Sequence, residues 1–328
     1  MKRFNVGIDS YGLEFRRLTP FELLDWALMN DADGVQFSGI DPALGLEVDK
    51  PFLEELGAYA AENNLYLEWG GGQHIPLDLA SGKPLDIRAV NRKAAEEARI
   101  LGVSVIRSCS GGLMRWTPDA LPTETYLRLS AESLKAQLSM LRDHGVTLAL
   151  ETHFEFTTFE ILRLFDMCDV APGEGLGICL DTMNLLTMLE DPVPATRRVL
   201  PWVVATHIKD GGILLRDEGL VSFPAEAGEG IIDFAAIFDL LAAQPRRINL
   251  SLEDHGGDFP IPIFDPVFLS GFPNLTAGEL TSLLKLALLS AEAVRTGQIG
   301  VLDRKLWPRV GEARLKRGLR NIRRIANG

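Results

Sequence analysis

Cysteine is scarce in this sequence, and that scarcity limits the classes of protein to which the chain can belong. Cys109, Cys168 and Cys179 are the only three cysteines among 328 residues, and none of them forms a CxxC pair. Three scattered thiols can build neither a disulfide framework nor a thiolate-rich metal site. The composition therefore favours a reducing compartment, and we expect a cytoplasmic protein.

Long apolar runs and an excess of positive charge are also missing. No stretch reaches the roughly 18 consecutive apolar residues of a membrane span, and the opening MKRFNVGIDS lacks the apolar core of a signal peptide. Lys and Arg number 33 against 45 Asp and Glu, which gives a formal net charge of −12. Because a nucleic-acid backbone is bound by basic surfaces, we expect neither nucleic acid nor a membrane as a partner.

What the sequence does contain is a series of eight short apolar segments separated by helical segments. Such an alternation predicts an α/β protein with a closed (β/α)8 TIM barrel rather than an open doubly wound sheet. The predicted strands are Phe4–Asp9, Gly34–Phe37, Leu65–Trp69, Val103–Arg107, a strand opening at Val146 and reaching Glu151, Leu176–Leu180, Val203–Thr206 and Ile248–Leu252.

The length fits a single domain, 1–328, in which the barrel occupies about residues 4–295. Thr123–His144 reads as one long helix, and Ala277–Arg295 as the eighth barrel helix. His255–Asn274, between strand eight and that helix, is long for a βα loop and carries four prolines and four phenylalanines. We expect this loop either to cover the active site or to bury its phenylalanines in a subunit contact. A C-terminal extension, 296–328, is predicted to add a helix that packs on the outside of the barrel.

Four polar side chains stand where the last four predicted strands end. They are Glu151, Asp181, His207 and Glu253. The carboxyl ends of barrel strands meet at the catalytic face, so three carboxylates and an imidazole should share a small volume there. Singly, each has an ordinary explanation as a helix cap or a hydrogen-bonded core histidine. Together they would repel unless a cation intervenes, which predicts a divalent metal. Oxygen ligands with one nitrogen suit Mn²⁺ first, then Mg²⁺ or Co²⁺, while Zn²⁺ remains an alternative.

These residues resemble the sugar phosphate isomerase/epimerase superfamily, also described as xylose-isomerase-like TIM barrels. The resemblance covers about Asn5 to Arg295. Its carriers are Glu151 in LALETH, Asp181 in CLDTMN, His207 in THIKD, Glu253 in LSLEDHGG and the segment Gly228–Asp233. It implies a metal-dependent isomerase or epimerase that abstracts a proton alpha to the carbonyl of a sugar or cyclitol. It also implies that Glu151 and Glu253 act as the acid/base pair.

The sequence departs from that family's pattern at two positions. Asn184 stands where many members carry a histidine, and Ile213 stands where ketose 3-epimerases often carry an arginine. Both departures weaken the interpretation of this chain as a simple epimerase. The endonuclease relatives, which use three zinc ions, need more histidines than the five present here.

A second branch of the superfamily contains dehydratases and lyases of keto-sugars, including 3-keto-glycoside lyases and C-glycoside deglycosidases. The stretches GIDSYG and WGGGQH are more similar to that branch than to the ketose epimerases. For such a lyase, His153 is the first choice as proton carrier, because strand alternation places it on the same side as Glu151. A non-catalytic sugar-binding barrel is the third alternative.

Further side chains near strand ends are candidate substrate contacts, and each has a structural alternative. Lys209 could neutralise an oxyanion or be a surface lysine, and Arg107 could bind substrate or form an internal ion pair. The remaining candidates are His74, His255, Trp69, Trp116 and Asn184. The histidines could contact hydroxyls or face solvent, the tryptophans could stack on a sugar or pack in the core, and Asn184 could donate to a hydroxyl. The phenylalanine-rich loop also predicts a homo-oligomer, or a hetero-oligomer with a small partner subunit.

Overall fold

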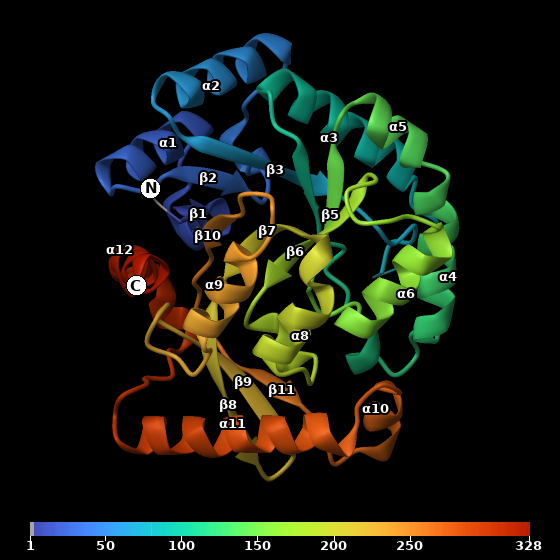
Figure 1. The fold of residues 1–328 in the computed structure, drawn as a ribbon, viewed down its shortest axis with the longest axis vertical. Helices are drawn as coiled ribbons and strands as arrows, with labels where there is room; N and C mark the ends of the chain where they lie inside the picture. The colour runs from blue at the N-terminus through green and yellow to red at the C-terminus, as the bar shows by residue number, and fades with distance from the viewer. Residues whose placement is uncertain (1–2, 80) are drawn as a thin grey trace.

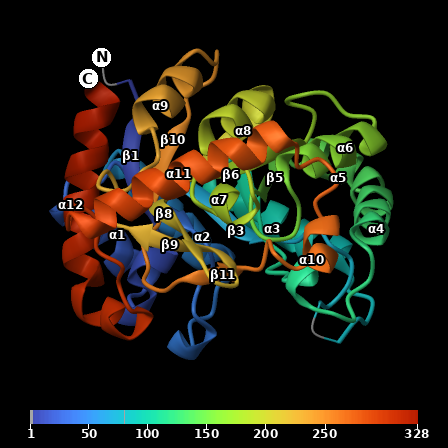
Figure 2. The same cartoon turned by 90° about the horizontal axis from the view of Figure 1, so that it is seen from below.

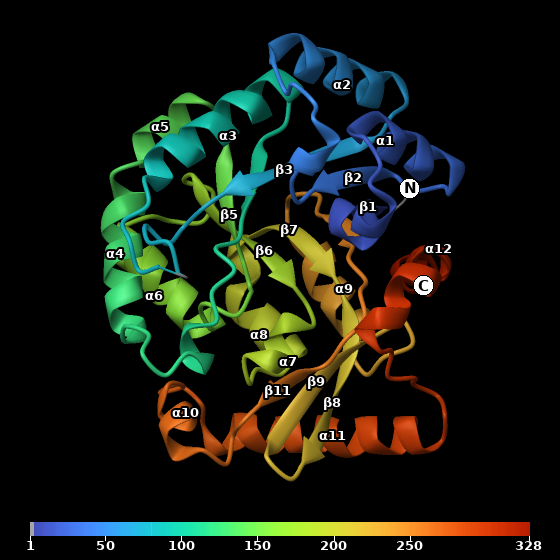
Figure 3. The ribbon, with the colours of Figure 1, turned by 180° about the vertical axis from the view of Figure 1, so that it is seen from behind.

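Eight parallel strands close into a barrel at the centre of the chain, as Figures 1 and 3 show from its two ends. The structure is a computed structural model that describes residues 3–79 and 81–328. The barrel order is β1-β10-β7-β6-β5-β4-β3-β2, and every neighbouring pair is parallel. The strands are β1 (Asn5–Asp9), β2 (Gly34–Phe37), β3 (Tyr66–Gly72), β4 (Val105–Ser108), β5 (Thr147–Glu151), β6 (Leu176–Asp181), β7 (Val203–Ile208) and β10 (Asn249–Leu252). The predicted TIM barrel is confirmed.

Helices surround this barrel and pack their apolar faces on it, and several of them begin at a side-chain cap. Thr19 and Glu22 form a reciprocal capping box at α1, and Thr157 and Glu160 form another at α6. The surrounding helices are α1 (Pro20–Met29), α2 (Lys50–Glu62), α3 (Ile87–Leu101), α4 (Thr123–Lys135), α5 (Leu138–Asp143), α6 (Thr158–Cys168), α8 (Pro192–Val199) and α9 (Phe234–Ala242). Shorter elements connect them: η1 (Ser10–Arg16), η2 (Pro42–Leu44), η3 (Met114–Trp116), α7 (Asn184–Thr187) and η4 (Leu200–Trp202).

The single helix predicted over Thr123–His144 is wrong in one respect, because the chain breaks between α4 and α5. Gln137 stands at the break with its side chain fully buried. Its Nε2 donates to Ser133 O, and its Oε1 accepts a 3.0 Å hydrogen bond from Asn91 Nδ2 of α3. A buried amide satisfied across two helices outweighs the local helical preference, which residue spacing alone does not reveal.

A three-stranded antiparallel sheet stands beside the barrel, and the sequence did not predict it. It consists of β8 (Asp210–Arg216), β9 (Gly219–Ala225) and β11 (Phe259–Ile261), in the order β11-β9-β8. β8 follows β7 and β11 follows β10, so the sheet rises from the carboxyl ends of the barrel strands, as Figure 2 shows from below. The long loop after strand eight therefore contains β11 and then α10 (Pro266–Ser270).

The last two long helices exchange the roles expected of them. α11 has the predicted bounds, Ala277–Arg295, but it packs on β8 of the added sheet rather than on the barrel (Figure 1). α12 (Trp307–Asn327), reached through η5 (Arg304–Leu306), packs against β1, β10 and α9, where an eighth barrel helix belongs. Its buried residues Leu315, Leu319 and Ile322 join the main hydrophobic core. The C-terminal segment is thus part of the barrel wall.

In the described part of the chain no helix combines the length and the apolar character needed to span a membrane.

Candidate metal centre and active-site cavity

The four side chains predicted at the strand ends converge at one point of the barrel rim. Glu151 ends β5, Asp181 ends β6, His207 lies in β7 and Glu253 directly follows β10. Each offers a ligand atom, and these four atoms lie within 4.8 Å of one another. All four residues are buried. Parallel register explains the convergence, since Asp181 pairs with His207 and Glu151 pairs with Cys179 of β6.

The His207 ring lies at the centre of this group. Its Nδ1 is 2.8 Å from Glu253 Oε2 and 3.4 Å from Glu151 Oε1, and its Nε2 is 3.5 Å from Asp9 Oδ2. Neither ring nitrogen has the geometry of a hydrogen bond to any described residue, although both are buried. A buried nitrogen without a hydrogen bond, directed at carboxylate oxygens, is the arrangement expected around a bound cation. The donor set therefore fits a divalent metal.

Two cations of the chain itself reach into the same group. Arg107 Nη1 donates to Glu151 Oε2 at 2.9 Å, and Lys209 Nζ lies 2.9 Å from Glu253 Oε1 and 3.4 Å from Asp181 Oδ2. The Lys209 side chain is 6% exposed, so the surface alternative for this lysine is wrong. The repulsion among the carboxylates is thus relieved in part without any metal.

Burial and these cations set the charge states of the carboxylates. Burial by itself raises the pKa of Glu151, but Arg107 and His207 hold that pKa below its ordinary value. Burial likewise opposes ionisation of Glu253, yet Lys209 and His207 keep its pKa well below the ordinary value. For Asp181, burial outweighs the attraction of Lys209 and raises the pKa to about 6. All three are mainly ionised at neutral pH.

A count of charges leaves room for a divalent cation. The carboxylates around the His207 ring are Asp9, Glu151, Asp181 and Glu253, and the cations paired with them are Arg107 and Lys209. Burial lowers the pKa of His207, but Cys179 and the surrounding carboxylates raise it well above the ordinary value, so without a metal the ring carries a proton. A metal ligand must be the neutral imidazole, and in that form two negative charges among these residues lack a partner. One divalent ion would balance them.

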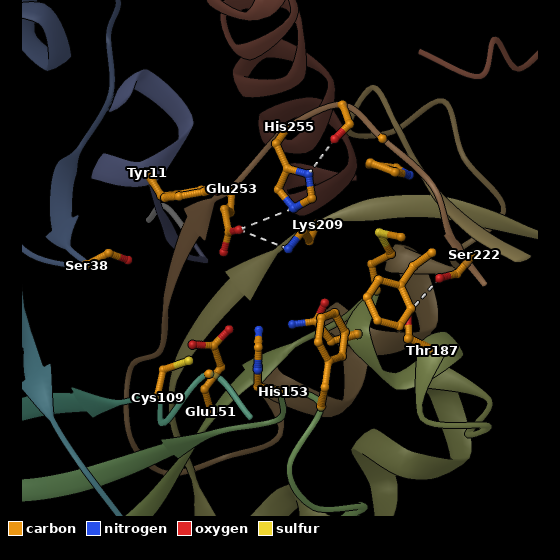
Figure 4. Close-up of a pocket in the computed structure, with 18 of the residues that line it drawn as sticks. Tyr11, Ser38, Cys109, Glu151, His153, Thr187, Lys209, Ser222, Glu253 and His255 are labelled. Carbon is orange, nitrogen blue, oxygen red and sulfur yellow. Dashed lines mark hydrogen bonds and ion pairs between the residues drawn. The ribbon is translucent and has the colours of Figure 1, made fainter. Parts of the chain in front are cut away.

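Two members of this group, Glu151 and Glu253, line a cavity of about 510 Å³ (Figure 4). Predicted residues that line it are Arg107, Glu151, His153, Asn184, Lys209, Glu253 and His255. Asn184 is 2% exposed, and its Nδ2 has no hydrogen-bond partner among the described residues. Burial, then the charge of Lys209, lowers the pKa of His255 to about 3, so its imidazole is neutral.

Three predicted substrate contacts lie outside this cavity. His74 is buried, with Nδ1 2.9 Å from Ser108 Oγ and its ring against Phe156. Trp69 is buried and donates from Nε1 to Glu97. For Trp69 the core-packing alternative is the correct one, whereas His74 neither lines the cavity nor faces solvent. Trp116 lies behind the cavity wall, where its ring contacts three phenylalanines: Phe154, Phe259 and Phe268.

His153 faces the cavity with two partners that the sequence did not reveal. Its Nδ1 lies 2.9 Å from Glu155 Oε2, and Cys109 Sγ completes a group of ligand-type atoms within 4.8 Å. Burial lowers the pKa of His153, but Cys109 and Glu155 more than offset it, so the pKa lies well above the ordinary value. Glu155 is 1% exposed, and the signal that could have found it is a carboxylate two residues after a strand-end histidine.

The segment Gly228–Asp233 has a structural role beside the metal ligands. Asp210, next to Lys209, accepts hydrogen bonds from the amides of Gly211, Gly228 and Gly230. A side chain at Gly230 would place Cβ 2.0 Å from Asp210 Oδ1, so only glycine fits. This loop holds the start of β8, and with it Lys209, against the barrel rim.

Comparison with known proteins agrees with this geometry. A 3-oxo-isoapionate decarboxylase of Pectobacterium atrosepticum is 32% identical over 123 residues, which are 37% of this chain and 43% of that protein, less than half its length. A solved L-ribulose 3-epimerase superimposes with a TM-score of 0.57 at 23% identity, covering 90% of this chain and 96% of that one.

A xylose isomerase-like TIM barrel protein from Mycobacterium smegmatis, solved in complex with magnesium, superimposes with a TM-score of 0.59 at 14% identity. It covers 88% of this chain and 99% of that one. These structures share the fold. The family model described as "Xylose isomerase-like TIM barrel" matches residues 24–267, about three quarters of the sequence. The chain belongs to the xylose isomerase-like TIM barrel family.

Proposed function

We propose that this chain is a divalent-metal-dependent isomerase or epimerase that abstracts a proton alpha to the carbonyl of a sugar or cyclitol. The observation that carries the proposal is the convergence of Glu151, Asp181, His207 and Glu253 beside a cavity that two of them line, with buried His207 nitrogens that have no hydrogen bond to any described residue. Structural neighbours named as a sugar epimerase and as a magnesium complex support it. Mn²⁺ is the first candidate metal because the set is rich in oxygen.

A bound divalent ion would act as a Lewis acid and stabilise the negative charge that develops on the carbonyl oxygen as the proton leaves. The protein supplies the geometry around it. Arg107 holds Glu151, and Lys209 holds Glu253, so each carboxylate has a fixed orientation before substrate arrives. Such preorganisation avoids reorganisation during the reaction.

Proton transfer requires a base within hydrogen-bond reach of the alpha carbon. In the epimerase mechanism Glu151 and Glu253 fill the acid and base roles, and both line the cavity from different strands. Their low pKa values make them weak bases, however, so His153 is the stronger candidate for the base. Glu155 orients its ring through Nδ1.

Two donors are placed to bind substrate oxygens. Asn184 Nδ2 and Arg107 Nε are both buried in the cavity wall, and neither has a hydrogen-bond partner within the described ranges of the chain. Leaving a buried donor unpaired costs about 1–3 kcal/mol, which a substrate hydroxyl or carbonyl could recover. These residues would therefore favour a ligand with several oxygens.

Deuterium exchange tests this class of reaction even when the product is unidentified. The Mn²⁺-loaded protein is incubated in D₂O with a panel of ketoses and keto-inositols, and NMR follows the signal of each proton alpha to the carbonyl. We expect metal-dependent loss of one such signal. If the protein binds no divalent metal, gains no thermal stability with Mn²⁺ and exchanges no proton, it is a non-catalytic barrel instead.

A second function, a keto-sugar lyase or decarboxylase, is favoured by one comparison and one structural feature. The relative that is 32% identical over part of the chain is named a decarboxylase. His153, paired with a buried carboxylate at the cavity wall, offers a single protonation site of the kind that such a reaction needs. Release of CO₂, water or an aglycone from 3-keto acids and 3-keto-glycosides, without formation of an epimer, would select this function over the first.

A further inference from the structure

One wall of the cavity is built by three segments that are far apart in the sequence. They are η1 with Tyr11, the loop after β10 with His255 and Gly256, and η5 with Arg304. The Tyr11 ring contacts the rings of His255 and Trp307, with centroids 5.9 and 6.1 Å away. These three aromatic rings therefore hold the start of the C-terminal segment against the cavity.

Arg304 is held at this wall by two hydrogen bonds. Its Nη2 donates to Tyr11 Oη at 2.7 Å, and its Nη1 approaches Gly256 O at 3.4 Å. Gly256 permits this approach, because a Cβ there would lie 3.0 Å from Arg304 Cα. A guanidinium has five N–H donors, so donors remain for a ligand. Arg304 is exposed, and these contacts with Tyr11 and Gly256 hold its guanidinium at the cavity.

Among the described cavity-lining residues, Arg304 is the cation without a carboxylate partner. Arg107 is paired with Glu151, and Lys209 with Glu253 and Asp181, whereas Arg304 has no ion pair. The exposed Asp258 also lines the cavity, yet it forms no ion pair with Arg304 in the described structure. The chain as a whole has a net charge of −12, so an arginine without an ion pair at the cavity is a local positive charge that attracts an anionic ligand.

Arg304 and Tyr11 come from the last and the first parts of the described barrel. Tyr11 lies in η1, directly after β1, and Arg304 lies in η5, which leads into α12. Both line the cavity beside Glu151 and Glu253, and neither belongs to the predicted metal-ligand set. This wall is therefore placed to contact a substrate without binding the metal.

We propose that Arg304, supported by Tyr11, binds a carboxylate of the substrate, so that the enzyme acts on a sugar acid rather than on a neutral sugar. This inference rests on the proposed function, because it concerns the substrate of the same metal centre. A planar guanidinium matches a carboxylate through two parallel hydrogen bonds. A phosphate is the less suitable anion, because it carries more negative charge than a carboxylate. Arg304 is a single cation, and the carboxylate of Asp258, which lines the same cavity, would repel the additional charge.

The test measures the dissociation constants of matched ligand pairs by calorimetry on the full-length, Mn²⁺-loaded protein. The pairs are D-glucuronate with D-glucose, D-galacturonate with D-galactose and 2-keto-D-gluconate with D-fructose, and D-fructose 6-phosphate is the phosphate probe. We expect at least one acid to bind tenfold or more tightly than its neutral partner. Arg304→Gln should abolish that preference, and Arg304→Lys should retain part of it. Lys305→Gln, at an exposed neighbour that does not line the cavity, should change nothing.

Three results would overturn the inference: no acid preference in any pair, a preference that survives Arg304→Gln, or tighter binding of the phosphate than of every acid. Metal binding separates these failures from failure of the proposed function. If Mn²⁺ binds and an alpha proton of a neutral ketose exchanges without acid preference, the carboxylate site alone is wrong. If Mn²⁺ does not bind, the metal-dependent function is wrong irrespective of Arg304.

Discussion

Lys209 Nζ lies 2.9 Å from Glu253 Oε1, so the chain places a cation of its own against a predicted metal ligand. Both side chains are buried, at 6% and 8% exposed. A buried pair of this kind is strongly destabilising when one partner is removed, because the other charge is left without compensation. Lys209 therefore stabilises the carboxylates in the metal-free protein, and it orients Glu253 when the metal is bound.

Replacing Lys209 by methionine should lower stability more in the metal-free protein than in the metal-bound one. We expect the free energy of unfolding to fall by about 3 kcal/mol in EDTA, the size of the effect for breaking a buried ion pair. Saturating Mn²⁺ should reduce the loss, because the ion supplies the missing positive charge. Urea unfolding in EDTA and in Mn²⁺ measures both values. Lys285→Met, on the exposed face of α11, is the control. If the free energy of unfolding falls equally in EDTA and in Mn²⁺, the proposal that Lys209 lies beside the metal site is wrong.

Replacing His207 by glutamine should remove most of the affinity for metal. Outer-shell partners typically contribute about 10–100-fold to metal affinity, so loss of a direct ligand should exceed that range. Calorimetric titration with Mn²⁺ and measurement of the metal content after purification check this. His144→Gln is a matched control, since His144 lies beside Met140 O within its own helix region and outside both clusters of metal-ligand type. Similar affinity in the His207 and His144 variants would rule out His207 as a ligand.

The barrel and its ligand set could be predicted because both follow from local rules. Short apolar strands mark the barrel, and parallel register brings their carboxyl ends to one rim. Glu151, Asp181, His207 and Glu253 were therefore expected to meet, and their ligand atoms do meet.

The features that could not be predicted depend on contacts between distant segments. Asp210–Arg216 pairs with a strand whose only local sign is a short alternating pattern, and β11 joins that strand from beyond the last barrel strand. The helix Ala277–Arg295 was expected on the barrel, but α12 takes that place with a buried pair between Arg314 and Asp254. Glu155 and Arg304 likewise depend on partners that their own neighbourhoods in the sequence do not reveal.

Replacing Glu190 by glutamine should change how stability depends on pH. Burial, only partly offset by hydrogen bonds from Thr158 and the charge of Arg198, raises the pKa of Glu190 from 4.5 to about 7. A carboxyl with a raised folded-state pKa stabilises the fold below pH 4.5, and this contribution is lost as pH rises through 7. The wild type should therefore lose up to about 3 kcal/mol from this group over that window.

The glutamine variant should lack this component of the decline, because its amide does not ionise. Urea unfolding at half-unit steps from about pH 4.5 to 7.5 measures the slope in each protein. Glu62→Gln, an exposed residue at the end of α2, is the control and should follow the wild type. A glutamine variant whose slope equals that of the wild type would show that Glu190 is ionised in the folded protein throughout this range.

Replacing Glu155 by glutamine should move the pH dependence of catalysis through its effect on His153. The Glu155 carboxylate lies 2.9 Å from His153 Nδ1 and helps to hold the pKa of that imidazole above its ordinary value. A base works only when deprotonated, so a raised pKa places the rising limb of kcat/KM at high pH. Removing the negative charge should shift that limb to lower pH by about one unit or more.

The rate of deuterium exchange from about pH 5 to 9 gives this profile, with Glu132→Gln on the exposed face of α4 as the control. His153→Asn should lower kcat and retain Mn²⁺ binding, because His153 is not one of the four ligands. A lower rate at every pH with an unmoved limb would mean that Glu155 has only a structural role. An unmoved limb in His153→Asn as well, with kcat preserved, would exclude His153 as the base and leave Glu151 and Glu253 as the acid/base pair.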